Sequence, residues 1–97
     1  MTTLHILSRS PFNDASFSSG LRLLAAGDAL LLTGDAAWAL QPGTAPAASL
    51  AALSQSVCVL EEDLLARGLQ APAGVQVVDY AGFVALTLQH ARVNSWL

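Results

Sequence analysis

The amino-acid sequence predicts an α/β fold, a three-layer sandwich with a small, open and mostly parallel sheet between helices. Short apolar runs alternate with helix-like segments along the 97 residues. These runs are almost continuously apolar, which is typical of parallel strands that helices cover on both faces. The strand–helix order repeats about four times, and such repeats favour right-handed crossovers within one sheet.

The predicted elements follow one another closely. Four apolar runs are expected as strands: Thr3–Leu7, Asp28–Thr33, Ser56–Leu60 and Val75–Val78. Helical segments are expected between and after them: Asp14–Ala26, Asp35–Leu40 followed by Pro46–Leu53, Glu61–Ala66 and Asp79–His90. Residues 41–46 form a connecting loop. The last residues, Val93–Leu97, have no partner in this pattern, and we expect them to pack across the body or onto a neighbouring chain.

Capping residues and glycines support the helix boundaries. Asn13 or Asp14 can cap the first helix, and Gly27 can end it in a left-handed conformation. Thr44 can cap the segment that has Pro46 in its first turn. Gly68 stands where the third helical region should stop. In the last helix, Tyr80, Phe83, Leu86, Leu88 and His90 are predicted to continue one amphipathic face.

The composition predicts a subunit of a larger assembly. Residues 1–97 are expected to form a single domain; 54% of them are hydrophobic and only 11% are charged. Soluble domains usually carry about 25% charged residues. A chain this short has little interior in which to bury the surplus apolar area. We therefore expect an apolar surface that partner chains cover.

Membrane insertion and nucleic-acid binding are both disfavoured. The most apolar stretch, residues 21–40, contains Arg22, Asp28 and Asp35, and each such charge near a bilayer centre costs about 2.5–3.5 kcal/mol. Ser8–Ser10 interrupt the N-terminus before a signal peptide could form, so we expect a cytoplasmic protein. The net charge is −3, and the four basic residues are scattered arginines. Direct binding to RNA or DNA needs clustered cations that this chain lacks.

The carboxyl ends of the predicted strands contain most of the candidate chemistry. They lead into Ser8–Ser10, Gly34–Asp35, Glu61–Asp63 and Asp79–Tyr80, and functional sites of open α/β sheets usually lie at this edge. Carboxylates at helix N-termini repel phosphate, and no glycine-rich phosphate-binding motif occurs, so we expect no nucleotide or other cofactor. We interpret Glu61, Glu62 and Asp63, together with Asp35 and Asp79, as capping residues. Metal binding or acid–base chemistry by these carboxylates is the alternative.

Cys58 is the one cysteine, which excludes an intramolecular disulfide and a multi-cysteine zinc site. Val57 and Val59 flank it in a predicted strand, so we interpret it as a small buried hydrophobic residue. Reactive thiols need partial exposure and a nearby cation or helix N-terminus. A persulfide-carrying Cys58 is the alternative.

His5, His90 and Trp96 are weaker candidates. His5 lies in the first predicted strand, where a satisfied core or interface histidine is expected, although a Cys58–His5 dyad is conceivable if their strands are neighbours. His90 lies near the end of the last helix, where positive charge is favourable. Trp96 is a possible interface residue, because aromatic residues are enriched at binding hot spots, with local packing as the alternative.

Four segments in this order, with a terminal Ser-Trp, resemble the TusB/DsrH family over nearly the whole chain. They are LHILSRSPF (Leu4–Phe12), GDALLLTGDAAWAL (Gly27–Leu40), VLEEDLLARGL (Val59–Leu69) and VDYAGFVALTLQHARVNSW (Val78–Trp96). The resemblance implies a DsrE-like fold, in agreement with the strand–helix pattern.

The resemblance also implies a function. Proteins of the TusB type assemble with TusC-like and TusD-like subunits into a heterohexamer with two copies of each. That complex passes a persulfide sulfur from TusA to TusE for the 2-thiolation of tRNA wobble uridine, and the TusD-like subunit has the sulfur-carrying cysteine. This chain is then a non-catalytic subunit. Sulfur-oxidising DsrH proteins have a cysteine early in the first helix region, where this chain has Gly20, and Cys58 does not match that position.

Two other functions remain open. The chain can be a DsrH-like sulfur carrier that uses Cys58, or a stand-alone binding module whose homo-oligomer covers its apolar surface. In the preferred interpretation we expect it to self-associate, or to be poorly soluble, without its partners.

Overall fold

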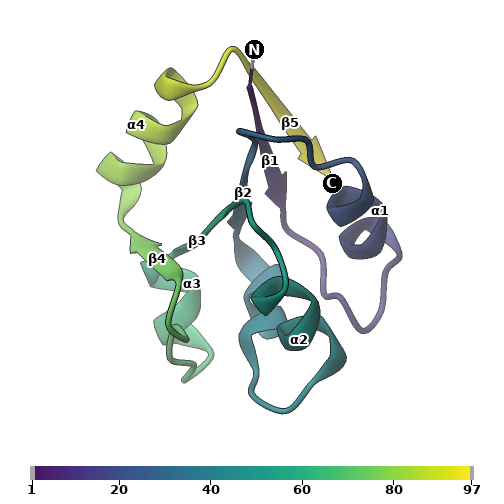
Figure 1. Ribbon diagram of the computed structural model, residues 1–97. Coiled ribbons are helices and arrows are strands. Elements are labelled where there is room, and N and C mark those ends of the chain that lie inside the picture. The colour runs from purple at the N-terminus through teal and green to yellow at the C-terminus, as the bar shows by residue number, and fades with distance from the viewer. Residues whose placement is uncertain (1, 97) are drawn as a thin grey trace.

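The computed structural model describes residues 2–96, and a five-stranded sheet crosses the molecule. The strand order is β4-β3-β2-β1-β5, and neighbouring strands pair in parallel (Figure 1). The strands are β1 (Thr3–Leu7), β2 (Ala29–Leu32), β3 (Ser56–Leu60), β4 (Val75–Val78) and β5 (Arg92–Trp96). The predicted α/β class with a parallel sheet is confirmed.

Helices connect the strands. They are α1 (Ser16–Arg22), the 3₁₀ helix η1 (Gly34–Leu40), α2 (Ala45–Ala51), α3 (Glu61–Ala66) and α4 (Tyr80–Gln89). Two caps form as expected: the Thr44 side chain accepts a hydrogen bond from the Ala47 N–H, and the Asp79 side chain accepts one from the Gly82 N–H. Both side chains satisfy helix N–H groups that have no partner within the helix.

The path of the chain explains why the two faces of the sheet are covered unequally. Strands β1 to β4 follow one another in one direction, whereas β5 returns to pair with β1. Right-handed crossovers put the helices of a one-directional run on one face and the helix of the returning connection on the other. Accordingly, α1, η1, α2 and α3 pack on the first face and α4 on the second. Figure 1 shows α4 well apart from α1 and α2.

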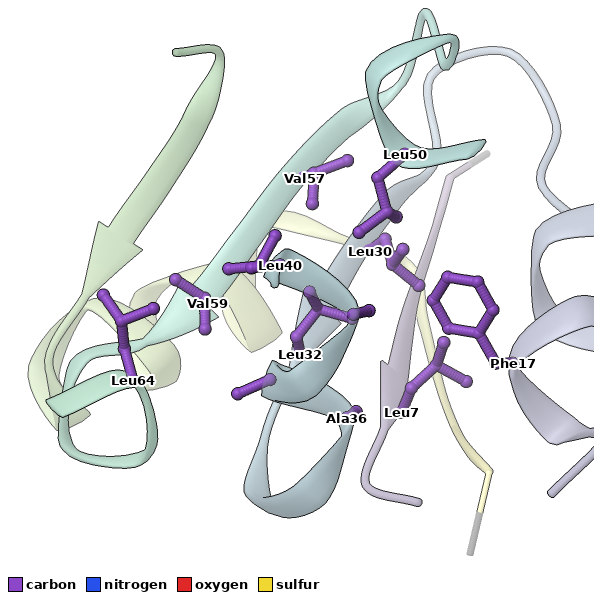
Figure 2. Close-up of a cluster of buried hydrophobic side chains, with 12 residues drawn as sticks. Leu7, Phe17, Leu30, Leu32, Ala36, Leu40, Leu50, Val57, Val59 and Leu64 are labelled. Atoms are coloured by element: carbon purple, nitrogen blue, oxygen red, sulfur yellow. The ribbon is translucent and has the colours of Figure 1, made fainter. Parts of the chain in front are cut away.

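The larger core cluster lies on the first face (Figure 2). Phe17 of α1 points toward Leu7 on β1 and Leu30 on β2, and Leu64 of α3 lies beside Val59 on β3. The strand residues of this cluster alternate with those of the second face, as the pleat of a strand requires. The first face is therefore a conventional layer of helices over a sheet.

The second face has a smaller core. Its buried members are Leu4, Ala29, Leu31, Cys58, Leu60 and Val78, and α4 contributes the partly buried Phe83 and Leu86. One ten-residue helix thus covers a sheet of five strands. No side chain of α4 is as buried as the residues of the core.

The end of the chain differs from its prediction. The expectation that Val93–Leu97 have no partner in the sheet is wrong, because Arg92–Trp96 form β5 and pair with Thr3–Leu7 of β1. Leu97 lies outside the described residues. The sequence does not predict this strand because β5 has the sequence RVNSW rather than an apolar run, and four of its five residues are exposed. Edge strands need no continuous apolar sequence.

Several predicted helix boundaries are also corrected. The first helix begins two residues after Asp14 and ends at Arg22 rather than at Ala26. Gly27 does have a left-handed φ of 84°, but it belongs to the turn into β2. In α4, Phe83 and Leu86 pack on the core while Tyr80 and Leu88 are exposed, so the five-residue face predicted for this helix is wrong.

Candidate functional site

The carboxylates at the carboxyl edge of the sheet form structural contacts. Asp63 of α3 accepts a hydrogen bond from the Gly34 N–H at the start of η1, at 2.8 Å. Arg67 approaches Asp35 at 2.8 Å and Asp63 at 3.6 Å. These contacts join the N-terminus of η1 to α3 across the ends of β2 and β3. Asp63 and Asp35 thus stabilise the junction between two helices.

The other acidic residues near this edge also have local roles. Asp14 accepts a hydrogen bond from the Ser16 N–H at 2.7 Å. That bond, aided by the nearby Arg9, holds the pKa of Asp14 below its usual range. Glu61 and Glu62 stand in the first turn of α3, where negative charge stabilises the helix dipole. Among residues 2–96, no three histidine, cysteine or acidic side chains lie close enough together to hold a metal ion.

Cys58 lies in the middle of β3, on the second face of the sheet. It is 1% exposed, and burial raises the pKa of its thiol. Its neighbours in the second core are apolar side chains from β1, β2 and β4. A thiol in this environment stays protonated and out of contact with solvent at neutral pH.

The suggested Cys58–His5 dyad is wrong. β2 lies between β1 and β3, and the register aligns His5 with Leu30, which belongs to the first face. Cys58 aligns with Leu31 and points to the second face. The two side chains therefore lie on opposite sides of the sheet.

His5 instead belongs to a buried chain of hydrogen bonds. Its Nε2 atom lies 3.3 Å from Oδ2 of Asp28, and both side chains are about 6% exposed. Asp28 also accepts hydrogen bonds from the Ala25 N–H at 3.0 Å and the Thr3 N–H at 2.9 Å. These backbone bonds, helped by His5, hold the pKa of Asp28 below its usual range. The prediction of a satisfied core histidine agrees with this geometry.

Trp96 packs locally at the end of β5. Its indole Nε1 donates to Nδ1 of His5 at 3.3 Å, and the residue packs against the first core cluster. A Cβ atom on Gly20 would lie 3.0 Å from the Leu7 side chain and 3.7 Å from Nε1 of Trp96. Gly20 therefore allows α1 to approach Leu7 and Trp96 closely. An interface role of Trp96 stays a prediction.

A hollow of about 340 Å³ lies at the opposite edge of the sheet, beside the amino ends of β3 and β4. Leucine, valine, alanine and proline side chains dominate its lining, and Gln55 and Gln70 are the polar ones. None of the lining residues is acidic, basic or a thiol. The lining has no group for acid–base or nucleophilic catalysis.

The second face is the most unusual surface of the described residues. Neither its strand residues nor any residue of α4 is charged. The register and core membership give its strand residues as Leu4, Ile6, Ala29, Leu31, Ser56, Cys58, Leu60, Gln76, Val78, Val93 and Ser95. Val93 is 45% exposed beside Leu4. An uncharged face of this extent resembles a protein interior more than a solvated surface.

The outer side of α4 is apolar as well. Tyr80, Val84 and Leu88 follow one another at intervals of four residues and are 59%, 55% and 81% exposed. We call these three residues the α4 stripe. A helix at the surface of a monomer normally has charged or polar residues on its outer side. The α4 stripe and the uncharged second face are therefore the features that best indicate a contact with another chain.

Sequence reasoning missed two of these features. The pairing of His5 with Asp28 is hidden because the partners are 23 residues apart. The α4 stripe could have been predicted from the sequence, since Tyr80–Gln89 contains no charged residue. This lack of charge indicates a helix with partners on both sides rather than one amphipathic face. Within residues 2–96, no helix has the length and apolar character that a bilayer span requires.

Comparisons with known proteins show the family to which the sequence is similar. The sequence profile of the family described as "DsrH like protein" matches residues 9–93. Protein TusB of Shigella sonnei is 42% identical over 95 residues, which cover 96% of this chain and 99% of that protein. Protein TusB of Escherichia coli K12 is 41% identical over 95 residues with the same coverage.

A solved structure shares the fold. The ychN protein from E. coli superposes with a TM-score of 0.78, covering 99% of this chain and 100% of that chain. The two sequences are 21% identical, so this likeness concerns the fold alone.

Proposed function

This chain belongs to the DsrH-like family, and from that premise we propose that it is a non-catalytic subunit of a TusBCD-type sulfur-relay complex. In this proposal residues 1–97 act as a single cytoplasmic domain. Their partners are TusC-like and TusD-like subunits in a heterohexamer, and TusA and TusE act through that complex. The pathway product is 2-thiouridine at the tRNA wobble position.

One observation carries the proposal: the uncharged second face bears a single helix whose outer side is also apolar. Partner subunits of the same fold would bury the α4 stripe and remove its apolar side chains from water. Burying apolar area stabilises an association by about 25 cal/mol per Å² before the costs of association are subtracted. A subunit of this kind provides a binding surface for its partners rather than a catalytic group.

The geometry of the reactive groups supports a non-catalytic role. Cys58 is enclosed by apolar side chains, and Asp35, Asp63 and Asp79 hold helix ends in place. A sulfur carrier needs a thiolate that can meet donor and acceptor cysteines of other proteins. In the proposed complex that thiolate belongs to the TusD-like partner.

Deletion and complementation in the native host test this function. We expect deletion of the gene to abolish 2-thiouridine in tRNA, measured by mass spectrometry of nucleosides. The wild-type gene and the Cys58→Ala variant should both restore it, because the thiol has no role in the relay. Protein levels of the variant must match the wild type, since Cys58 is a core residue.

The outcomes separate the three functions. Loss of 2-thiouridine with the variant at normal protein levels would identify Cys58 as a sulfur carrier. Unchanged 2-thiouridine after deletion, together with a homo-oligomer that co-purifies with no TusC-like or TusD-like chain, would identify a stand-alone module.

A further inference from the structure

The edge strand β5 has one anchored side chain. Its first four residues are exposed, whereas Trp96 is partly buried against the first core cluster. The indole ring of Trp96 lies at 26° to the imidazole ring of His5, with centroids 6.5 Å apart. The Ser8 hydroxyl also donates to the Trp96 carbonyl at 3.4 Å. Besides the parallel ladder to β1, these contacts hold the carboxyl end of β5.

The bond from Trp96 fixes the protonation state of His5. An indole N–H can only donate, so Nδ1 of His5 must accept through its lone pair. The single ring proton of neutral His5 is then on Nε2, where it donates to Asp28. Asp28, His5 and Trp96 thus form one chain of bonds that requires a neutral imidazole.

Asp28 is the one titratable group in hydrogen-bond contact with His5 among the described residues. In the sheet, His5 lies between Leu30 of β2 and Asn94 of β5. The nearest elements also have basic residues at exposed positions, Arg22 on α1 and Arg92 on β5, and Arg92 aligns with Thr3 rather than with His5. His90 contacts the Thr2 hydroxyl at 2.9 Å.

We propose that protonation of His5 breaks the bond that holds the Trp96 indole, and so weakens the attachment of the carboxyl end of β5, while His5 stays in place on Asp28. A protonated imidazole donates from both nitrogens, so its Nδ1–H would face the indole N–H, and that contact is repulsive. On the other side of the ring, the Asp28 carboxylate gains attraction for the imidazolium. Protonation therefore breaks one end of the chain of bonds and strengthens the other.

Asp28 can hold the imidazolium because it stays ionised at mildly acidic pH. Two backbone N–H groups, from Ala25 and Thr3, keep the pKa of Asp28 below its usual range. The core on the first face thus remains closed around His5 while the edge strand loosens. This pH-sensitive attachment of β5 goes beyond the proposed function and does not depend on it.

The test is a pH titration followed by NMR. The chain is labelled with ¹⁵N at tryptophan and histidine and is studied in its complex if it is purified as one. Between pH 7.5 and 5 we expect the Trp96 indole N–H to lose at least tenfold of its protection from hydrogen exchange. The midpoint should coincide with that of the His5 ring nitrogens. The Trp38 indole, in η1, serves as the internal control and should not follow this midpoint.

The variant His5→Asn sharpens the test. The asparagine oxygen can accept the indole bond near the position of Nδ1 but takes up no proton, so Trp96 should lose its pH dependence. Constant protection of Trp96 while wild-type His5 titrates, or a neutral His5 throughout this pH range, would overturn the proposal. The wild-type comparison of the two tryptophans decides the matter even if the variant does not fold.

Discussion

At the scale of single residues, the buried side chains of His5 and Asp28 are paired although they lie 23 residues apart in the sequence. The Asp28 carboxylate accepts hydrogen bonds from two backbone N–H groups and contacts His5. Its charge is therefore compensated although the residue is buried, with 6% exposed. Removing the carboxylate would leave its hydrogen-bond donors without a partner in a water-poor site. The stability of the first face should therefore depend on this carboxylate.

We predict that Asp28→Asn lowers the free energy of unfolding by about 1.5–3 kcal/mol at pH 7, because bonds to a charged acceptor are lost. Its folded pKa is depressed, so this stabilisation is fully present above the ordinary carboxyl value of 3.8 and is lost as pH falls through the folded pKa. Urea unfolding of both proteins at a series of pH values measures it.

The exposed Asp35→Asn variant is the matched control for this measurement. The Asp35 side chain is 63% exposed, so its pairing with Arg67 should contribute less than about 1 kcal/mol. A difference between wild type and Asp28→Asn that stays constant from pH 7 to pH 3 would contradict the explanation.

What the sequence predicts at this scale depends on distance along the chain. The burial of Cys58 follows from its valine neighbours in one strand, so local reasoning predicts it. The bonds of His5 join β1 to a turn before β2 and to the last strand, and no local pattern contains them. The rejected Cys58–His5 dyad fails for the same reason, because the face of each side chain depends on register.

At the scale of elements, the sequence predicts those helix starts that a neighbouring capping side chain determines. Thr44 and Asp79 stand directly before their helices, and their side chains cap them as expected. The existence of β5 depends on a tertiary contact instead. β5 forms because β1 offers an open edge for pairing, although the sequence RVNSW is mostly polar.

We predict that Asp79→Ala lowers the free energy of unfolding by about 1 kcal/mol, since the cap of α4 at the Gly82 N–H is lost. Asp79→Asn should keep most of this stability, because an asparagine side chain also caps well. Thermal or urea unfolding of the three proteins provides the comparison. Equal losses from alanine and asparagine would show that charge rather than capping is responsible.

At the scale of the whole molecule, the topology decides where the apolar surface lies. Three of the four connections place their helices on the first face, and the fourth returns over the second face with the single helix α4. The composition already indicated excess apolar area but could not locate it. The crossover rule, once the position of β5 is known, places it on α4 and the second face.

The central claim is that the α4 stripe is buried by partner subunits, and co-expression with the TusC-like and TusD-like chains of the same genome tests it most directly. Mass measurement after size-exclusion chromatography should find a heterohexamer for the wild type and for Leu65→Lys, which changes a 67% exposed leucine of α3. The 81% exposed Leu88→Lys on α4 should leave the fold intact by circular dichroism but abolish the hexamer. A full-size complex with Leu88→Lys would contradict the claim.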